Sequence, residues 1–206
     1  MDFVDIVRNA SAQTLSVEVY QAEFAEVYAS VTEPAIKLER AQHFDEEDFP
    51  SWVALLEGDW DRSLALLRES RESLTEYFDR HAEFRRVRIV ESPLTPYMRW
   101  ELHSFVERVA AGERIRVLPG SEVAEMECSG PLPELVILRP DRMYEVLYDE
   151  RGVHTGARRI SEPDVVRHAR AVLQSLYDRS EDLTTFFTRE VAPATTSLSG
   201  PAWSSR

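Results

Sequence analysis

The fold is decided by residues 85–119, which read RRVRIVESPLTPYMRWELHSFVERVAAGERIRVLP. Two short segments of this stretch, RVRIV at 86–90 and RIRVLP at 114–119, alternate arginine with aliphatic residues. A period of two is typical of β-strands, because successive side chains of a strand point to opposite faces of the sheet. In the first strand, Val87 and Ile89 are therefore expected to point inward, and Arg86 and Arg88 to point outward.

The residues between these two strands predict a helix. Thr95 suits its N-terminal cap, Pro96 its first turn and Gly112 its C-terminal end. An apolar stripe recurs along it at intervals of four, three and four residues, formed by Met98, Leu102, Phe105 and Val109. A strand, a helix and a strand of this length form a right-handed crossover. We therefore expect residues 86–118 to be a parallel βαβ unit.

Three further helices are predicted from the periodicity of apolar residues. The first spans residues 14–31, and the second spans residues 51–80 with an interruption around Gly58. The third begins at Ser161, which has the side chain of an N-terminal cap. A short helical segment after it ends near Glu190.

Strands are also predicted outside the crossover. Residues 35–40, AIKLER, alternate weakly and predict a short strand at the edge of the sheet. Residues 134–140, ELVILRP, have the apolar core of a buried strand, and residues 143–161 predict a hairpin that turns at 149–152. The predicted fold class is therefore α+β, a mixed sheet of about five or six strands with one parallel βαβ crossover, packed by N-terminal and C-terminal helices.

The domain organisation follows from composition along the chain. We expect residues 1–193 to form a single globular α+β domain, since 206 residues are enough for one well-buried core. Residues 194–206 are low in charge and rich in Ser, Thr, Pro and Ala, which is typical of a disordered tail.

Charge and hydropathy limit the partners and the location that we expect. The formal net charge of −13 disfavours direct binding to nucleic acid and favours a basic protein partner. Apolar runs reach only four or five residues, as at 135–138, whereas a membrane-spanning helix requires about 20. The first residues are acidic where a signal peptide is basic. We therefore expect a cytoplasmic protein that does not bind a membrane.

Polar residues around the start of the crossover helix form the candidate site. Ligands often bind beyond the carboxyl ends of parallel strands, which places a pocket near residues 92–99. The candidate residues for binding a small anionic ligand are Arg88, Tyr97, Arg99, Trp100, Glu101 and Arg116. The alternative is that these charges pair with one another and brace the sheet. The sequence leaves both interpretations open.

Other polar motifs do not predict chemistry. His103 and Glu107 have the spacing of a chelating pair, but two ligands are too few for a metal site. Residues 45–48 are acidic but lack the glycine and the alternating spacing of a calcium loop. The single cysteine, Cys128, has no activating base nearby in the sequence. We therefore expect no catalytic residue, no metal and no cofactor.

Several motifs together resemble a known family. They are AIKLER at 35–40, RVRIVESPLTPYMRWEL at 86–102 and AAGERIRVLP at 110–119, followed by an apolar strand and a hairpin. This order is similar to that of uncharacterised bacterial proteins from high-GC Gram-positives, known only as a domain of unknown function. Members are often encoded beside, or fused to, helix-turn-helix regulators. The resemblance covers roughly residues 35–187 and implies an accessory or regulatory role without any particular chemistry.

The sequence therefore supports two main hypotheses, which belong to different functional classes. The first is a noncatalytic accessory or regulatory protein that binds a basic helix-turn-helix transcription regulator and is modulated by a small ligand. The alternative is an enzyme or small-molecule-binding protein with a pocket lined by arginine, tyrosine, tryptophan and glutamate. A third hypothesis is a homo-oligomeric scaffold built through the N-terminal helix.

Overall fold

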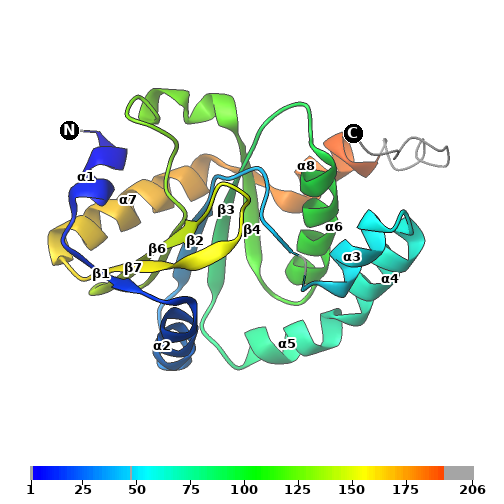
Figure 1. Ribbon diagram of the computed structural model, residues 1–206, viewed down its shortest axis with the longest axis horizontal. Helices are drawn as coiled ribbons and strands as arrows, with labels where there is room; N and C mark the ends of the chain where they lie inside the picture. The colour runs from blue at the N-terminus through cyan, green and yellow to red at the C-terminus, as the bar shows by residue number, and fades with distance from the viewer. Residues whose placement is uncertain (1, 47, 193–206) are drawn as a thin grey trace.

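A mixed β-sheet runs through the centre of the protein (Figure 1). The computed structural model describes residues 2–46 and 48–192, and within them the sheet has eight strands in the order β1-β7-β6-β5-β2-β3-β4-β8. The strands are β1 (Ala12–Leu15), β2 (Ala35–Glu39), β3 (Phe84–Val90), β4 (Arg114–Pro119), β5 (Leu135–Arg139), β6 (Arg142–Tyr148), β7 (His154–Ile160) and β8 (Glu181–Asp182). Five or six strands were predicted. The two outermost, of four and two residues, are too short to show a periodic pattern.

The predicted βαβ crossover is confirmed. β3 and β4 are parallel neighbours, and α6 (Pro96–Ala110) connects them. The Thr95 hydroxyl caps α6 by accepting a hydrogen bond from the Met98 amide at 3.1 Å. Beyond the other end of the helix Gly112 adopts a φ of +118°, a conformation that favours glycine. The apolar stripe faces the core, since Met98 and Leu102 are fully buried.

Residues 35–40 form an interior strand, so the prediction of an edge strand is wrong. β2 lies between β5, to which it is antiparallel, and β3, to which it is parallel. Ile36 and Leu38 belong to an apolar cluster on one face, while Lys37 and Glu39 point to the other face. Alternation with charged residues usually indicates an exposed face. Here helices cover both faces, so the alternation separates an apolar buried layer from a charged buried one.

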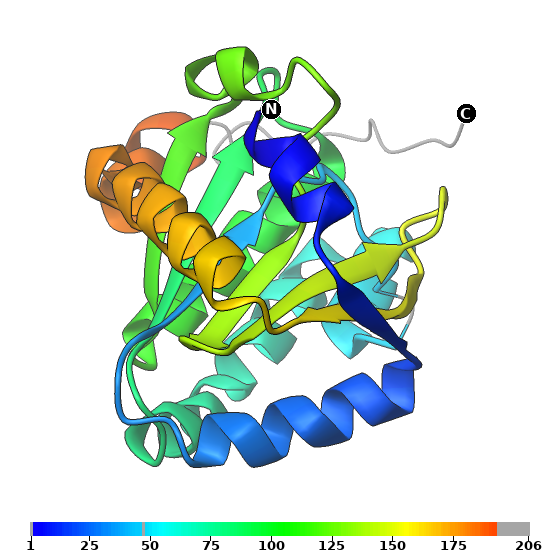
Figure 2. The ribbon, with the colours of Figure 1, turned by 90° about the vertical axis from the view of Figure 1, so that its left-hand side faces the viewer.

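Helices cover both faces of the sheet (Figures 1 and 2). One face packs against α1 and α7, whose residues Val7 and Leu173 share an apolar cluster with Val87 and Ile89 of β3. The other face packs against α2, α5 and α6. The helices outside the crossover are α1 (Phe3–Asn9), α2 (Val17–Ala29), α3 (Pro50–Leu56), α4 (Trp60–Glu69), α5 (Arg71–Asp79), α7 (Pro163–Arg179) and α8 (Leu183–Glu190), with 3-10 turns at Gly120–Glu122 and Ala124–Met126.

The helices differ from the prediction in their boundaries. Residues 12–15 pair with β7 as a strand, so the first predicted helix is shorter and begins only after Ser16. The second predicted helix is three helices, because the chain breaks at Ser70 as well as near Gly58. Ser161 does not cap α7, where Glu162 takes the cap position without a side-chain hydrogen bond. The break at Ser70 lies inside the second predicted helix, and α1 was not predicted. The other differences concern helix ends, where local signals are weakest.

Two further sequence predictions concern the C-terminal tail and membrane-spanning helices. The tail expected to be disordered, residues 194–206, lies outside the residues that the structure describes. Among the helices of the described chain, none combines the length and the apolar character needed to cross a membrane.

The buried stripe of α6 gives a direct test of this packing. Replacing Leu102, which is 0% exposed, with alanine removes buried methyl groups and leaves a cavity. We expect Leu102→Ala to lower the free energy of unfolding by about 2–5 kcal/mol, measured by urea denaturation. Val19→Ala, at a position 51% exposed on α2, is the control and should change it by less than about 0.5 kcal/mol. Equal effects of the two substitutions would show that the stripe is not buried.

Candidate functional site

A stripe of charged side chains crosses the middle of the sheet on the face covered by α2, α5 and α6. It consists of Lys37 and Glu39 on β2 and of Arg86 and Arg88 on β3, and we call it the charged stripe. The parallel register places Lys37 beside Arg86 and Glu39 beside Arg88. Because side chains alternate along a strand, all four point to the same face. Each strand therefore contributes two polar groups at positions i and i+2.

The crossover helix turns a matching polar row toward this face. Tyr97, Glu101, Ser104 and Arg108 are spaced by four, three and four residues, so they share one side of α6 next to the apolar stripe. Glu101 and Arg108 contact the charged stripe or its partners, and Ser104 lines the space between helix and sheet. Two polar layers therefore face each other inside the protein.

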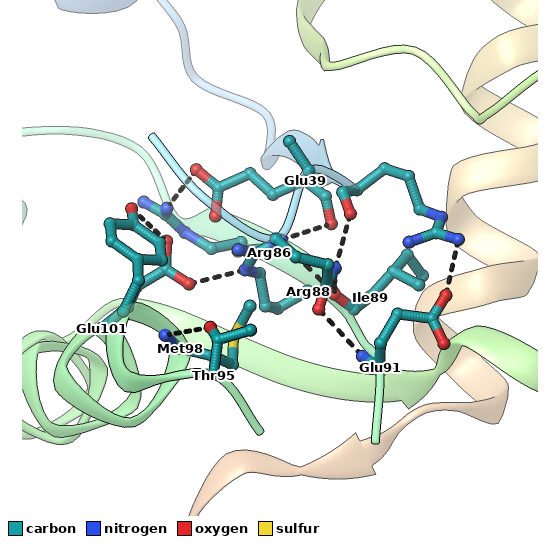
Figure 3. A network of polar contacts seen from close by, with 12 residues as sticks. Glu39, Arg86, Arg88, Ile89, Glu91, Thr95, Met98 and Glu101 are labelled. Carbon is teal, nitrogen blue, oxygen red and sulfur yellow. Dashed lines mark hydrogen bonds and ion pairs between the residues drawn. The ribbon is translucent and has the colours of Figure 1, made fainter. Parts of the chain in front are cut away.

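Arg86 is the centre of the ion pairs. Its Nε donates to Glu113 Oε1 at 2.7 Å and its Nη1 donates to Glu39 Oε1 at 2.6 Å. Lys37 Nζ lies 2.6 Å from the same Glu39 oxygen. Arg108 Nε donates to the other oxygen of Glu113 at 2.5 Å. Two carboxylates thus bridge three cations, and Figure 3 shows Arg86 reaching Glu39 from the neighbouring strand.

Arg88 extends the network toward the start of α6 (Figure 3). Its side chain is 0% exposed, and its Nε donates to Glu101 Oε2 at 2.7 Å. The Tyr97 hydroxyl lies 3.1 Å from Glu101 Oε1 and 3.2 Å from Glu46 Oε1. A tyrosine hydroxyl has one proton, so it donates to one of these two carboxyls at a time. Glu46, in the acidic loop before α3, is therefore tied to the network through Tyr97.

The ion pairs set the charge states of the carboxyls. Burial acts to raise the pKa of Glu39, but the charges of Arg86, Lys37 and Arg88 outweigh burial and hold this pKa well below its usual range. Burial also acts to raise the pKa of Glu113, but the charges of Arg86 and Arg108 outweigh it and lower this pKa. Both groups are therefore carboxylates at neutral pH.

Two cavities open onto this network. The first, which we call the polar cavity, has a volume of about 340 Å³ and is lined by charged, polar and aromatic residues that include Glu39, Trp100, Glu101, Ser104 and Tyr148. The second, which we call the aromatic cavity, has a volume of about 320 Å³ and lies against α2, α5 and the sheet. Both linings contain the same three cations, namely Lys37, Arg86 and Arg108. The same three cations therefore lie between the polar cavity and the aromatic cavity.

Two buried polar atoms beside the polar cavity have no partner. Glu39 Oε2 and Trp100 Nε1 make no hydrogen bond to any described residue, although both residues line this cavity and are nearly fully buried. A buried acceptor or donor without a partner is unfavourable by about 1–3 kcal/mol. Two residues that line the polar cavity thus each keep one buried polar atom without a hydrogen bond to a described residue.

The structure brings together only some of the predicted site residues. Trp100 and Glu101 line the polar cavity. Arg88, expected to point outward to a ligand, is completely buried and does not line this cavity, since the sheet is covered on this face too. Arg116 pairs in register with Val87 and stacks on Tyr177 of α7 at 5.3 Å, which places it on the opposite face of the sheet.

Tyr97 and Arg99 complete the predicted set. Tyr97 is 3% exposed, so it acts within the network and is absent from the lining of both cavities. Arg99 is half-buried, does not line either cavity, and has an Nη1 without a hydrogen-bond partner among the described residues. The ion pairs and the cavity that were weighed as alternatives are both present, side by side.

Sequence reasoning missed the residues that join the two cavities. Lys37 lies in the strand that was placed at the edge, and Arg86 was expected to point outward but is buried. Arg108 was not considered, although it continues the polar row of α6 at the spacing that the apolar stripe also shows. Lys37 is the only lysine in the chain, and a lysine inside an apolar strand was a usable signal.

The weaker motifs have structural explanations. His103 packs against Trp60 and Phe187, and burial lowers its pKa to about 4. Glu107 accepts a hydrogen bond from Arg71 at 2.6 Å. Within the described residues, no group of three or more His, Cys, Asp or Glu side chains is arranged to hold a metal. Cys128 is exposed and its thiol donates to the Glu125 carbonyl at 3.3 Å.

Glu46 gives the site a testable pH dependence. Burial raises its pKa from 4.5 to about 7, with the nearby carboxylates of Glu101 and Glu39 adding to this and Tyr97 and Lys37 opposing it. Between about pH 4.5 and 7 the folded protein therefore holds a proton that the unfolded chain releases. Stability from this group is present at low pH and is lost as pH rises through the folded pKa.

We expect Glu46→Gln to remove this dependence. The free energy of unfolding of the variant, relative to the unsubstituted protein, should rise by about 1–3 kcal/mol between pH 5 and pH 8, measured by urea denaturation at each pH. Burial also raises the pKa of Glu134 to about 7, but that residue is unchanged in both proteins and cancels. Glu72→Gln, at an exposed position of α5, is the control. Parallel pH curves for the Glu46 variant and the unsubstituted protein would contradict the assignment.

Comparison with known proteins gives a family and a distant structural likeness. No protein with a curated description matches this sequence. Among solved structures, it is similar to TrmBL2, an archaeal chromatin protein whose structure shows a novel mode of DNA binding. The identity is 11% and the TM-score 0.41, and the match covers 83% of this chain and 53% of the other, so this chain spans about half the length of that protein. A likeness at this level does not indicate what the present chain binds. The chain belongs to the family described as a domain of unknown function, DUF6879, whose sequence model matches residues 22–188.

Proposed function

We propose that this protein is a noncatalytic binding protein for a small polar molecule, which it holds in the polar cavity. The observation that carries the proposal is an open cavity of about 340 Å³ beside the ion pairs, lined by charged residues that include Glu39, Arg86 and Glu101 and by aromatic residues that include Trp100. Ligand sites typically have volumes of about 300–1,000 Å³, apolar or aromatic walls and a few well-placed polar groups. The polar cavity has a volume in this range and aromatic residues on its wall, but most of its lining residues are charged or polar, which suits a polar molecule.

The ion pairs make the site rigid before a ligand arrives. Arg86 is fixed by two carboxylates, and Glu101 is fixed by Arg88, so the polar groups on the cavity wall lose little freedom on binding. Preorganisation of this kind increases affinity because the ordering of side chains has already occurred during folding. The same pairing favours binding over catalysis, because it holds Glu39 and Glu113 as carboxylates engaged with arginine.

The proposal is tested by filling the polar cavity from α6. Ser104 is half-buried and lines it, so Ser104→Trp should occupy the space a ligand would use. Ala110→Trp places the same side chain at an exposed position of the same helix and is the matched control. Thermal unfolding is measured with a panel of amino acids, nucleosides, sugars and organic acids.

We expect at least one compound to raise the Tm of the unsubstituted protein and of Ala110→Trp by several degrees, and to leave Ser104→Trp unchanged. A ligand at 100 times its Kd stabilises by about 2.7 kcal/mol, which corresponds to about 5–10 °C for a chain of this size. If no compound distinguishes the unsubstituted protein from Ser104→Trp, the polar cavity is not a binding site.

A second candidate function is the accessory role toward a basic helix-turn-helix regulator. It is supported by the formal net charge of −13 and by exposed carboxylates along two neighbouring helices, α4 and α5, namely Asp61, Glu69, Glu72, Glu76 and Asp79. Charge complementarity of this kind accelerates association and selects the partner. The high-GC Gram-positive origin and the regulator encoded nearby are expectations from the family resemblance and belong to this proposal.

A pull-down against a regulator encoded next to this protein tests the second candidate. We expect a complex at low salt that Glu69→Lys with Glu72→Lys weakens by about tenfold or more. The control is Glu18→Lys with Glu26→Lys on α2, which changes the net charge equally at exposed positions elsewhere. No complex at low salt, or equal weakening by both pairs, would count against a specific acidic contact.

A further inference from the structure

The aromatic cavity has apolar walls and a cationic end. Its apolar lining comes from α2, α5, β3 and β5 and consists of Tyr20, Phe24, Leu74, Tyr77, Phe78, Phe84 and Val136. Its charged lining, among the described residues, consists of Lys37, Arg86 and Arg108 alone. Their carboxylate partners do not line this cavity. Glu39 faces the polar cavity, and Glu113 is 0% exposed behind Arg86 and Arg108.

Two of the three cations, Lys37 and Arg108, retain hydrogen-bonding capacity. Lys37 has three N–H donors and one described ion pair, to Glu39. Arg108 uses Nε toward Glu113 and stacks over Phe78 at 5.6 Å, and no described residue accepts from its two terminal nitrogens. An anionic group at this position would therefore find donors that are already held in place by buried carboxylates.

We propose that the aromatic cavity is a second binding site, for an amphipathic monoanion, a carboxylic acid with an aromatic or aliphatic body. The carboxylate binds at Lys37, Arg86 and Arg108, and the apolar body lies in the aromatic cavity between α2 and α5. This inference goes beyond the proposed function, which concerns the neighbouring polar cavity. Neutral and cationic analogues with the same body bind more weakly, because only an anion matches a lining whose charges are all positive.

Binding of three naphthalene probes tests the inference by isothermal titration calorimetry. The probes are 2-naphthoate, the neutral 2-naphthylmethanol and the cationic 2-naphthylmethylamine, which share one apolar body. We expect the naphthoate to bind at least about tenfold more tightly than the alcohol, the minimum for a charge-assisted hydrogen bond. The amine should bind most weakly.

Substitutions test where the carboxylate and the apolar body of the ligand bind. Lys37→Met should weaken naphthoate by about tenfold or more and leave the alcohol within about twofold. Arg114→Met removes the same charge at an exposed position of β4 and should leave both affinities unchanged. Leu74→Trp fills the aromatic cavity and should abolish binding of all three probes, whereas Ser73→Trp, exposed on the same helix, should not.

The outcomes separate this inference from the proposed function. If the alcohol binds as tightly as the naphthoate and Leu74→Trp blocks both, the cavity binds small molecules but does not select anions. Suppose that no probe binds, but a panel compound still raises the Tm of the unsubstituted protein and not that of Ser104→Trp. The inference is then wrong and the proposed function remains. If neither probes nor panel compounds bind, both are wrong. Circular dichroism of each variant distinguishes lost binding from lost folding.

Discussion

The structure depends on the ion pairs that Arg86 makes inside the protein. This guanidinium, on β3, bonds to Glu39 on β2 and to Glu113 immediately before β4, so one side chain ties together three adjacent strands. Removing one member of a buried ion pair is unfavourable by about 3–5 kcal/mol, because the other charge is left uncompensated. The residues of the network therefore constrain one another. Replacing Arg86 would leave the buried charges of Glu39 and Glu113 with fewer partners.

The same constraint produces the cavities. Where the sheet and its helices meet through apolar side chains, as at Val87 and Leu173 on the opposite face, they pack closely. On the charged face the long side chains of Lys37, Arg86 and Arg108 meet carboxylates in fixed geometries, and helix and sheet cannot close the remaining space. A buried ion pair is seldom more stabilising than an apolar replacement, so stability alone does not account for this network.

Local signals were sufficient for part of this architecture. The crossover was predictable because its determinants, the Thr95 cap, the apolar stripe and Gly112, act over a few residues and agree with one another. The edge placement of residues 35–40 was wrong because strand order depends on pairing between distant segments. Two of the six predicted site residues line the polar cavity. Trp100 and Glu101 lie on the cavity, but Arg116 points away, since the register of β4 places it with Val87.

The amino-acid sequence by itself determined the fold class, the parallel crossover, the buried stripe of α6 and the excess of negative charge, because periodicity, caps and composition are properties of neighbouring residues. Only the tertiary structure decided that Lys37, Arg86 and Arg108 meet, that Arg88 is buried and that two cavities share a cationic wall. These residues come from β2, β3 and α6, and their side chains converge only after strand pairing has set which faces and which positions lie together.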